Sequence, residues 1–309
     1  MAHVLIVDDE PLIRSSLVEF LQDEHEVESA ESGPEAIELL AQRSTNGTVG
    51  APFDLLISDI NMRPMNGIDL LVQAKERWPG MRRALITGYD VDDYIRLIKR
   101  HGITNVITKS APFDFDEFVN TVRNILDPRR VFGLKRLLGD GATITSRALL
   151  THDQKDAFTE EMIAALTPHI DTPRRVFELR LVFEEIANNA FFHAFRNPDG
   201  TPVHSRERLE PLNPGEEIVA EFGLGDECHG FGVSDNAGSL TTDRFLEKIE
   251  RQVTQDGLMD EDGRGFFLAR AFSSRLIVNI EPSKRTEIMV LFSRRHSPTH
   301  KPLYLNLME

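Results

Sequence analysis

Over residues 1–127, short apolar runs alternate with longer amphipathic segments. In those segments apolar residues recur every three or four positions, which is the period of a helix with one buried face. Repeated alternation of strand and helix predicts a doubly wound, five-stranded parallel sheet of the flavodoxin-like kind, because right-handed crossovers place helices on both faces. The predicted strands are 4–7, 27–29, 55–58, 84–87 and 105–108, and the predicted helices are 11–23, 34–43, 67–77, 91–101 and 114–126.

The pattern changes after residue 127, where Asp-Pro-Arg-Arg ends the last of these helices. We therefore expect one domain at 1–127, a linker at 128–141 and a second domain at 142–309. The second domain has few strand–helix alternations and a hairpin, which predicts an α+β fold. Its predicted strands are 142–146, 217–222, 230–235, 275–281 and 286–293, and its predicted helices are 153–166, 174–194 and 264–273.

Composition supports a chain of two globular domains. The 309 residues exceed one ordinary core, and 40% hydrophobic with 28% charged residues is typical of soluble proteins. No apolar run approaches the roughly 20 residues that span a bilayer, and the N-terminus lacks the features of a signal peptide. Cys228 is the single cysteine, so no intramolecular disulfide is expected and the cytoplasm is the expected location. A net charge of −15 argues against nucleic-acid and membrane partners.

Three carboxylates follow predicted strands of the first domain. Asp8 and Asp9 come directly after the first strand, and Asp59 follows the third. Because the carboxyl ends of parallel strands meet at one edge of a sheet, we expect these side chains to converge. Crowded carboxylates repel one another unless a cation bridges them, and Mg²⁺ prefers oxygen ligands while keeping several waters. The pattern therefore predicts a magnesium site.

Two further polar side chains reach the same predicted edge. Thr87 ends the fourth strand and Lys109 follows the fifth. An ammonium group stabilises a phosphoryl group in transfer, and a hydroxyl donates a hydrogen bond to its oxygens. The edge is therefore suited to phosphoryl chemistry.

The order Asp8-Asp9, Asp59, Gly67, Thr87 and Lys109 resembles the receiver domain of bacterial response regulators. The resemblance implies a domain that is phosphorylated by an upstream histidine kinase. It also implies Asp59 as the phosphoacceptor, Asp8, Asp9 and Asp59 with the backbone carbonyl of Asn61 as Mg²⁺ ligands, and Thr87 and Lys109 as phosphoryl-binding residues.

A second constellation begins on the predicted helix 174–194. Glu185 and Asn189 lie four residues apart and hence on one helical face, where a carboxylate can orient a nucleophile beside a metal held by the amide. The same spacing is also typical of the polar stripe of an amphipathic helix. Further along the chain, an apolar strand ends at Asp235 and is followed by small residues up to Gly238, and Gly263-Arg264-Gly265 opens a helix. Glycines permit close approach of phosphate to a helix N-terminus.

This order of segments, completed by Thr286 on a strand, resembles the histidine-kinase-like (GHKL) ATPase superfamily, and most closely its anti-sigma-factor serine kinases. The resemblance implies a two-layer α+β sandwich that binds ATP and Mg²⁺, with a lid at 240–262. It implies Glu185 as general base, Asn189 as Mg²⁺ ligand and Asp235 as the adenine-reading residue. The other implied nucleotide-binding residues are Gly238, Gly263, Arg264, Gly265 and Thr286.

The two resemblances predict a response regulator in which Asp59 phosphorylation controls a protein serine/threonine kinase of a partner-switching pathway. Its expected partners are a STAS-type antagonist or a sigma factor, and a homodimer is expected. An alternative is a non-catalytic, anti-sigma-like switch, favoured by Ala237, Ser239 and Arg285 at positions where the superfamily usually has glycine. A histidine kinase fused to a receiver is disfavoured, because the chain has no room for a two-helix hairpin that carries a phosphoacceptor histidine.

Overall fold

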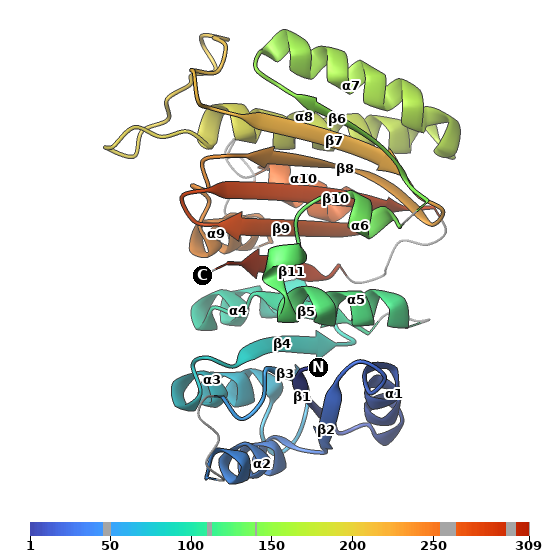
Figure 1. Cartoon of the computed structure of the whole chain (residues 1–309), viewed down its shortest axis with the longest axis vertical. Coiled ribbons are helices and arrows are strands. Elements are labelled where there is room, and N and C mark those ends of the chain that lie inside the picture. Colours follow the sequence, from blue (N-terminus) through green and yellow to red (C-terminus); the bar gives the residue numbers. More distant parts are fainter. Residues whose placement is uncertain (46–50, 110–112, 140, 254–263, 295–300, 309) are drawn as a thin grey trace. The chain divides into compact units, whose positions relative to one another are not determined.

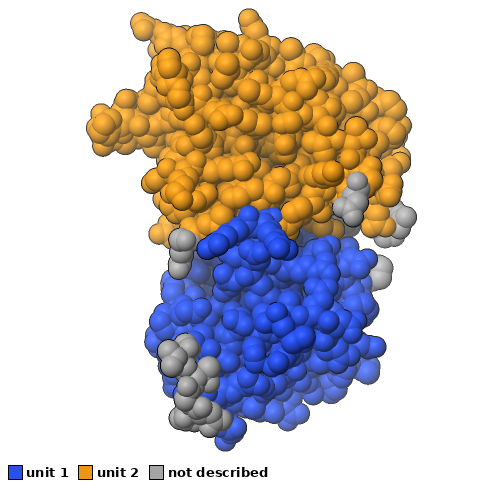
Figure 2. Space-filling model, in the orientation of Figure 1, with its two compact units in different colours: residues 1–130, 302–304 blue, residues 131–301, 305–309 orange. Residues whose placement is uncertain are grey.

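The computed structural model describes residues 1–45, 51–109, 113–139, 141–253, 264–294 and 301–308. The chain forms two compact units, which Figure 2 distinguishes by colour. Unit 1 comprises residues 1–130 and 302–304, and unit 2 comprises residues 131–301 and 305–309. None of the described helices is both long and apolar enough to cross a membrane.

Unit 1 contains the predicted parallel sheet, with strand order β2-β1-β3-β4-β5 (Figure 1). Leu303 and Tyr304 add an antiparallel pairing at β5. The strands are β1 (His3–Val7), β2 (Glu26–Ala30), β3 (Leu55–Asp59), β4 (Arg82–Thr87) and β5 (Asn105–Thr108), and the helices are α1 (Pro11–Leu21), α2 (Gly33–Thr45), α3 (Gly67–Arg77), η1 (Val91–Tyr94), α4 (Ile95–His101), α5 (Phe115–Leu126) and η2 (Pro128–Arg130).

The predicted helix 91–101 is wrong in its first turn, which is the 3₁₀ helix η1. The side chain of Asp90 accepts a hydrogen bond from the backbone N–H of Asp92, which favours a tight turn at this start. The α-helix begins only at Ile95.

Unit 2 is built on antiparallel strands in the order β6-β7-β8-β10-β9. Helices α7, α8 and α10 cover one face of this sheet, and α6 lies on the other (Figure 1). The elements are α6 (Lys135–Leu138), β6 (Thr143–Ala148), α7 (His152–Leu166), η3 (Thr167–His169), α8 (Pro173–His193), β7 (Ile218–Leu224), β8 (Cys228–Asp235), α9 (Thr242–Val253), α10 (Arg264–Phe272), β9 (Arg275–Glu281), β10 (Arg285–Ser293) and β11 (Leu303–Leu307), whose first two residues belong to unit 1.

Helix α8 is the central helix of unit 2, and its sequence explains both its start and its buried face. The Thr172 side chain accepts the backbone N–H of Arg175, and Pro173 occupies the first helical position, where its missing N–H costs nothing. Apolar residues at three- and four-residue spacing are fully buried against the sheet. Aromatic rings complete the layer between helices and sheet, with Phe183 in edge contact with Phe231 of β8.

The other face of the sheet binds the segment that follows residue 130. The buried carboxylate of Glu287 accepts the backbone N–H of Gly133 at 3.1 Å and the side-chain amide of Asn279 at 2.9 Å. The same Asn279 amide also donates to the Val131 carbonyl at 2.9 Å. Burial raises the pKa of Glu287, against the opposing effect of Arg285. These bonds fix residues 131–133 on β9 and β10.

The segment 128–141 was expected to be a linker, and the structure corrects this interpretation. Residues 128–130 form η2 in unit 1, whereas residues 131–138 belong to unit 2 and include α6. The physical reason is that this segment packs on unit 2. Leu134 and Leu138 are buried, and the backbone N–H of Leu134 donates to the carboxylate of Glu221 at 3.3 Å. A helix of four residues is too short to show hydrophobic periodicity in the sequence.

Replacement of Glu287 by alanine is expected to destabilise unit 2 by about 2 kcal/mol, because the Gly133 N–H and the Asn279 amide lose a buried acceptor. The matched control is Glu281→Ala on β9, whose exposed ion pair with Lys284 is expected to contribute less than about 0.5 kcal/mol. Hydrogen exchange of the β10 amides measures both free energies. Equal protection in the two variants would contradict the role assigned to Glu287.

Candidate functional site

Two carboxylates meet at the carboxyl edge of the unit 1 sheet. Asp8, directly after β1, is 0% exposed and Asp59, at the end of β3, is 6% exposed. The ammonium of Lys109 lies between them, at 2.8 Å from Asp8 Oδ2 and 2.6 Å from Asp59 Oδ1. The structure thus brings together three residues, the first and last of which are 101 positions apart in the sequence.

Backbone groups hold both carboxylates in place. The N–H of Asn61 donates to Asp59 Oδ2 at 2.7 Å, and the N–H of Glu10 donates to Asp8 Oδ1 at 2.9 Å. Gly67 explains how the chain returns past this edge, because a Cβ there would lie 1.9 Å from the carbonyl oxygen of Asp59. The glycine of the sequence pattern is therefore a steric requirement of the site.

Thr87 lies at the end of β4 and is fully buried. Its hydroxyl accepts the backbone N–H of Tyr89 at 3.0 Å, and its carbonyl accepts the backbone N–H of Lys109 at 2.6 Å. The second bond fixes the start of the Lys109 side chain beside the carboxylates. Asp9, in contrast, is exposed, so its carboxylate faces solvent.

The electrostatics of this edge suit a divalent cation. Burial raises the pKa of Asp59, although Lys109 opposes the shift, and the two carboxylates raise the pKa of Lys109 against its own burial. One ammonium balances fewer charges than Asp8, Asp9 and Asp59 carry together. Asp8 Oδ2 is buried and, within the part of the chain that the structure describes, accepts no hydrogen bond of regular geometry apart from its ion pair with Lys109.

In the described residues, no group of three or more His, Cys, Asp or Glu side chains is spaced to enclose a metal. Mg²⁺ does not need such a cage, since it keeps several waters and is commonly held by one or two carboxylates. The residues present fit that ion: Asp8, Asp9, Asp59 and the Asn61 carbonyl would hold it.

Unit 2 contains a second candidate site, a pocket that is partly open to solvent. Asn189 of α8, Asp235 at the end of β8 and Thr286 at the start of β10 all line it. Thr286 and Asp235 are direct partners in the antiparallel pairing of the two strands. Three residues predicted from separate motifs therefore share one cavity.

The pocket combines an apolar lining with one buried carboxylate. Val233, Ile288 and Phe266 supply apolar surface. Asp235 is 9% exposed, and its Oδ1 accepts the N–H groups of Ala237 at 2.9 Å and Gly238 at 3.1 Å. Burial raises the pKa of Asp235, and these hydrogen bonds oppose the shift. A flat heterocycle with an amino group fits this combination.

The glycines predicted for the site have measurable steric roles where the structure describes them. A Cβ on Gly265 would lie 2.8 Å from Asn189 Nδ2 and 3.2 Å from Glu185 Cβ, so the first turn of α10 packs on the Glu185–Asn189 face of α8. Gly238 has φ +57°, and a Cβ there would lie 2.4 Å from the Glu281 carbonyl. Gly263 and the side chain of Arg264 lie outside the described residues.

The expected lid at 240–262 is described only up to residue 253, where it contains α9. Sequence reasoning did not single out Arg244 and Lys248, which lie four residues apart on this helix and line the pocket. Their spacing on a strongly amphipathic helix was the available signal. His193, at the end of α8, also lines the pocket.

Comparison with known proteins identifies unit 1. Residues 4–123 match the family model of the response regulator receiver domain. The hydrogenase transcriptional regulatory protein HoxA of Cupriavidus necator is 32% identical over 133 residues, which are 43% of this chain and 26% of HoxA. A response regulator receiver protein of Anaeromyxobacter sp. is 34% identical over 110 residues, or 35% of this chain and 43% of that protein. The chain thus spans less than half the length of these relatives.

Two further similarities cover almost the whole length of the matched protein. The transcriptional regulatory protein ResD of Bacillus subtilis is 25% identical over 248 residues, which cover 72% of this chain and 93% of ResD. A crystal structure of the response regulator TrrA of Thermotoga maritima, in complex with Mg²⁺ and BeF, is 31% identical and covers 41% of this chain and 100% of TrrA, with a TM-score of 0.34.

The family match ends at residue 123 and therefore covers unit 1 alone. Within the match lie all the residues of the unit 1 edge, from Asp8 to Lys109, in the order predicted from the sequence. Residues 4–123 therefore form a response regulator receiver domain.

Proposed function

We propose that phosphorylation of Asp59 in the receiver controls an ATP-dependent protein serine/threonine kinase formed by unit 2. The observation that carries the proposal is the pocket in which Asn189, Asp235 and Thr286 converge, with Gly265 packed on the Glu185–Asn189 face beside it. A partner protein of the STAS-type antagonist or sigma-factor class would receive the phosphoryl group.

In the receiver, a carboxylate oxygen of Asp59 would attack the phosphorus atom of a phosphohistidine on an upstream kinase, and the P–N bond would break. Lys109 already lies 2.6 Å from Asp59, so its ammonium is in place to neutralise charge on the transferred group. The Thr87 hydroxyl would bind a phosphoryl oxygen afterwards. Bound Mg²⁺ supplies further neutralisation of the phosphate charge.

In unit 2, the adenine ring would lie on the apolar surface and donate its exocyclic amine to Asp235. Asn189 Nδ2 is buried and has no hydrogen-bond partner in the described residues, which is consistent with an amide that is completed by a ligand or a metal-bound water. Arg244 and Lys248 add two cations at the pocket. In a chain of net charge −15 their presence favours an anionic ligand such as a nucleotide.

Glu185 lies one helical turn before Asn189, and it would accept the proton of a serine or threonine hydroxyl during transfer. Its position against Gly265 places the carboxylate at the start of α10, where the phosphates of a nucleotide would meet the helix N-terminus. The kinase function rests on this juxtaposition.

The alternative is a non-catalytic switch that binds its partner and uses nucleotide as a structural ligand or not at all. Ala237, Ser239 and Arg285 favour it from the sequence. The guanidinium of Arg285 lies over the Phe132 ring at 4.3 Å and donates to Glu287, on the face of the sheet opposite the pocket. Arg285 is therefore weaker support for the non-catalytic switch than its sequence position suggests. Of these three residues, Ser239 lines the pocket.

Phosphorylation of Asp59 is tested with acetyl phosphate and Mg²⁺. Wild-type protein is expected to gain one phosphoryl group, measured by intact mass, and Asp59→Asn is expected to gain none. Asp93→Asn, a change of an exposed aspartate in the same unit, is the control and is expected to label fully. Labelling that survives Asp59→Asn would exclude Asp59 as the acceptor.

Nucleotide recognition is tested by titration calorimetry of the whole chain with ATP and with ITP, which has an oxygen in place of the exocyclic amine. Wild type is expected to prefer ATP, and Asp235→Asn is expected to reduce that preference at least about tenfold, or ~1.4 kcal/mol. The control is Asp226→Asn in the exposed turn before β8. An unchanged preference in Asp235→Asn would contradict the adenine-reading role.

Catalysis is separated from binding by Glu185→Gln. This variant is expected to bind ATP normally but to lose transfer of labelled phosphate to a STAS-type partner, by about 100-fold or more. Glu184→Gln changes the neighbouring, partly exposed carboxylate of α8 and should leave transfer intact. ATP binding without transfer in the wild type would favour the non-catalytic switch.

A further inference from the structure

A second cavity lies at the other end of the β8–β10 pair. It is lined by His229 near the start of β8 and by Phe292 near the end of β10, which are direct strand partners. Asp235 lies six residues along β8, so the two cavities are separated by roughly 20 Å of strand. Both lie on the helix-covered face, since His229 and Asp235 differ by an even number of positions.

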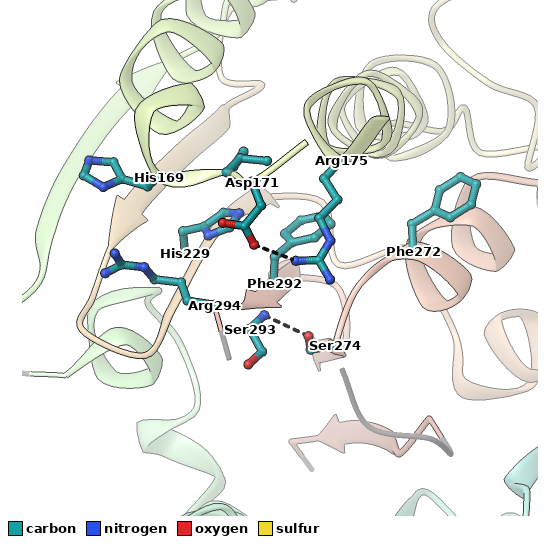
Figure 3. Close-up of a pocket in the computed structure, with 10 residues that line it drawn as sticks. His169, Asp171, Arg175, His229, Phe272, Ser274, Phe292, Ser293 and Arg294 are labelled. Carbon is teal, nitrogen blue, oxygen red and sulfur yellow. Dashed lines mark hydrogen bonds and ion pairs between the residues drawn. The ribbon is translucent and has the colours of Figure 1, made fainter. Parts of the chain in front are cut away.

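Basic side chains dominate this cavity (Figure 3). Arg175, from the first turn of α8, and Arg294, after β10, lie on opposite sides of His229 in that view, and His169 of η3 also lines the cavity. Among the described residues that line the cavity, the single acidic side chain is Asp171, which pairs with Arg175 at 3.6 Å. The cavity therefore carries an excess of positive charge in a chain whose net charge is −15.

His229 is the buried polar group of the cavity. It is 6% exposed, its ring stacks on Phe292 at 5.5 Å, and its Nδ1 has no hydrogen-bond partner in the described residues. A buried ring nitrogen without a partner is costly, and such groups in native proteins are usually satisfied by water or a ligand.

We propose that this cavity binds a phosphate-type oxyanion, held by Arg175, Arg294 and His229. Guanidinium groups match the paired oxygens of a phosphate, and imidazole adds a directional donor. The amino end of α8 contributes the positive end of a 21-residue helix dipole at Arg175. The ligand is either free phosphate or the phosphoryl group of a phosphorylated side chain.

Binding in this cavity is coupled to protonation of His229. Burial and, after it, the positive charges of Arg294, His169 and Arg175 together lower the pKa of His229 to about 4, although Asp171 opposes the shift. A bound dianion reverses that electrostatic balance and raises the pKa. Because the protonated ring then binds the anion more tightly, affinity increases as the pH falls toward the free-state pKa.

The test uses the whole chain and follows the histidine ring protons by NMR, with His229 assigned from His229→Gln. Inorganic phosphate is expected to shift the His229 resonance saturably at constant ionic strength, and O-phosphoserine is titrated in parallel. Tighter binding of O-phosphoserine assigns the cavity to a phosphorylated side chain, and tighter binding of phosphate assigns it to the free ion. Sulfate, whose charge is constant between pH 7.5 and 5, is expected to bind more tightly at the lower pH.

We expect Arg175→Gln and Arg294→Gln each to lower the affinity for phosphate by about fivefold or more. Both side chains are at least partly exposed, so these variants are expected to fold even if His229→Gln does not. Arg180→Gln, which changes another arginine of α8 that pairs with Glu160, is the control and should leave the titration unchanged. The proposal would be overturned if phosphate gave no saturable shift of the His229 resonance. It would also be overturned if both cavity variants bound phosphate as tightly as the wild type, or if the affinity for sulfate did not change with pH.

Discussion

The antiparallel pairing of β8 with β10 is the interaction on which the chemistry of unit 2 depends. Because side chains alternate between the two faces of a strand, one register fixes three sites together. It places Asp235 beside Thr286 at one end under the helices, and His229 beside Phe292 at the other end. It also directs Glu287 to the opposite face, and a slip of one residue would exchange these faces.

In the receiver, the corresponding constraint is the parallel sheet, which brings strand ends together whatever their distance in the sequence. This is why the carboxylate edge could be predicted residue by residue: Asp8, Asp59, Thr87 and Lys109 each follow or end a strongly apolar run. What the sequence did not show is that Lys109 bridges Asp8 and Asp59 directly. That contact depends on side-chain conformation and on the backbone bond from Lys109 to Thr87.

In unit 2, the strands and helices with long periodic patterns were predictable, and the resemblance to the GHKL superfamily implied the convergence of Asn189, Asp235 and Thr286. Features that depend on non-local pairing were not. The strand Leu303–Leu307 was not predicted, because a run of five residues is too short to show a regular period. The His229 cavity has no sequence motif either, since its basic residues come from four separate segments.

The strand β10 also relates the two faces of unit 2 to each other. Glu287 binds the Gly133 N–H on one face, and its neighbour Thr286 lines the candidate nucleotide pocket on the other. Residues 131–133 are therefore bound to the same two-residue stretch of backbone that contributes to the pocket. Because interiors are close-packed, a displacement of β10 at Glu287 cannot leave Thr286 where it is. The position of β10 at Thr286 and Glu287 therefore affects two regions. One is the segment 131–133, which directly follows the receiver, and the other is the candidate nucleotide pocket.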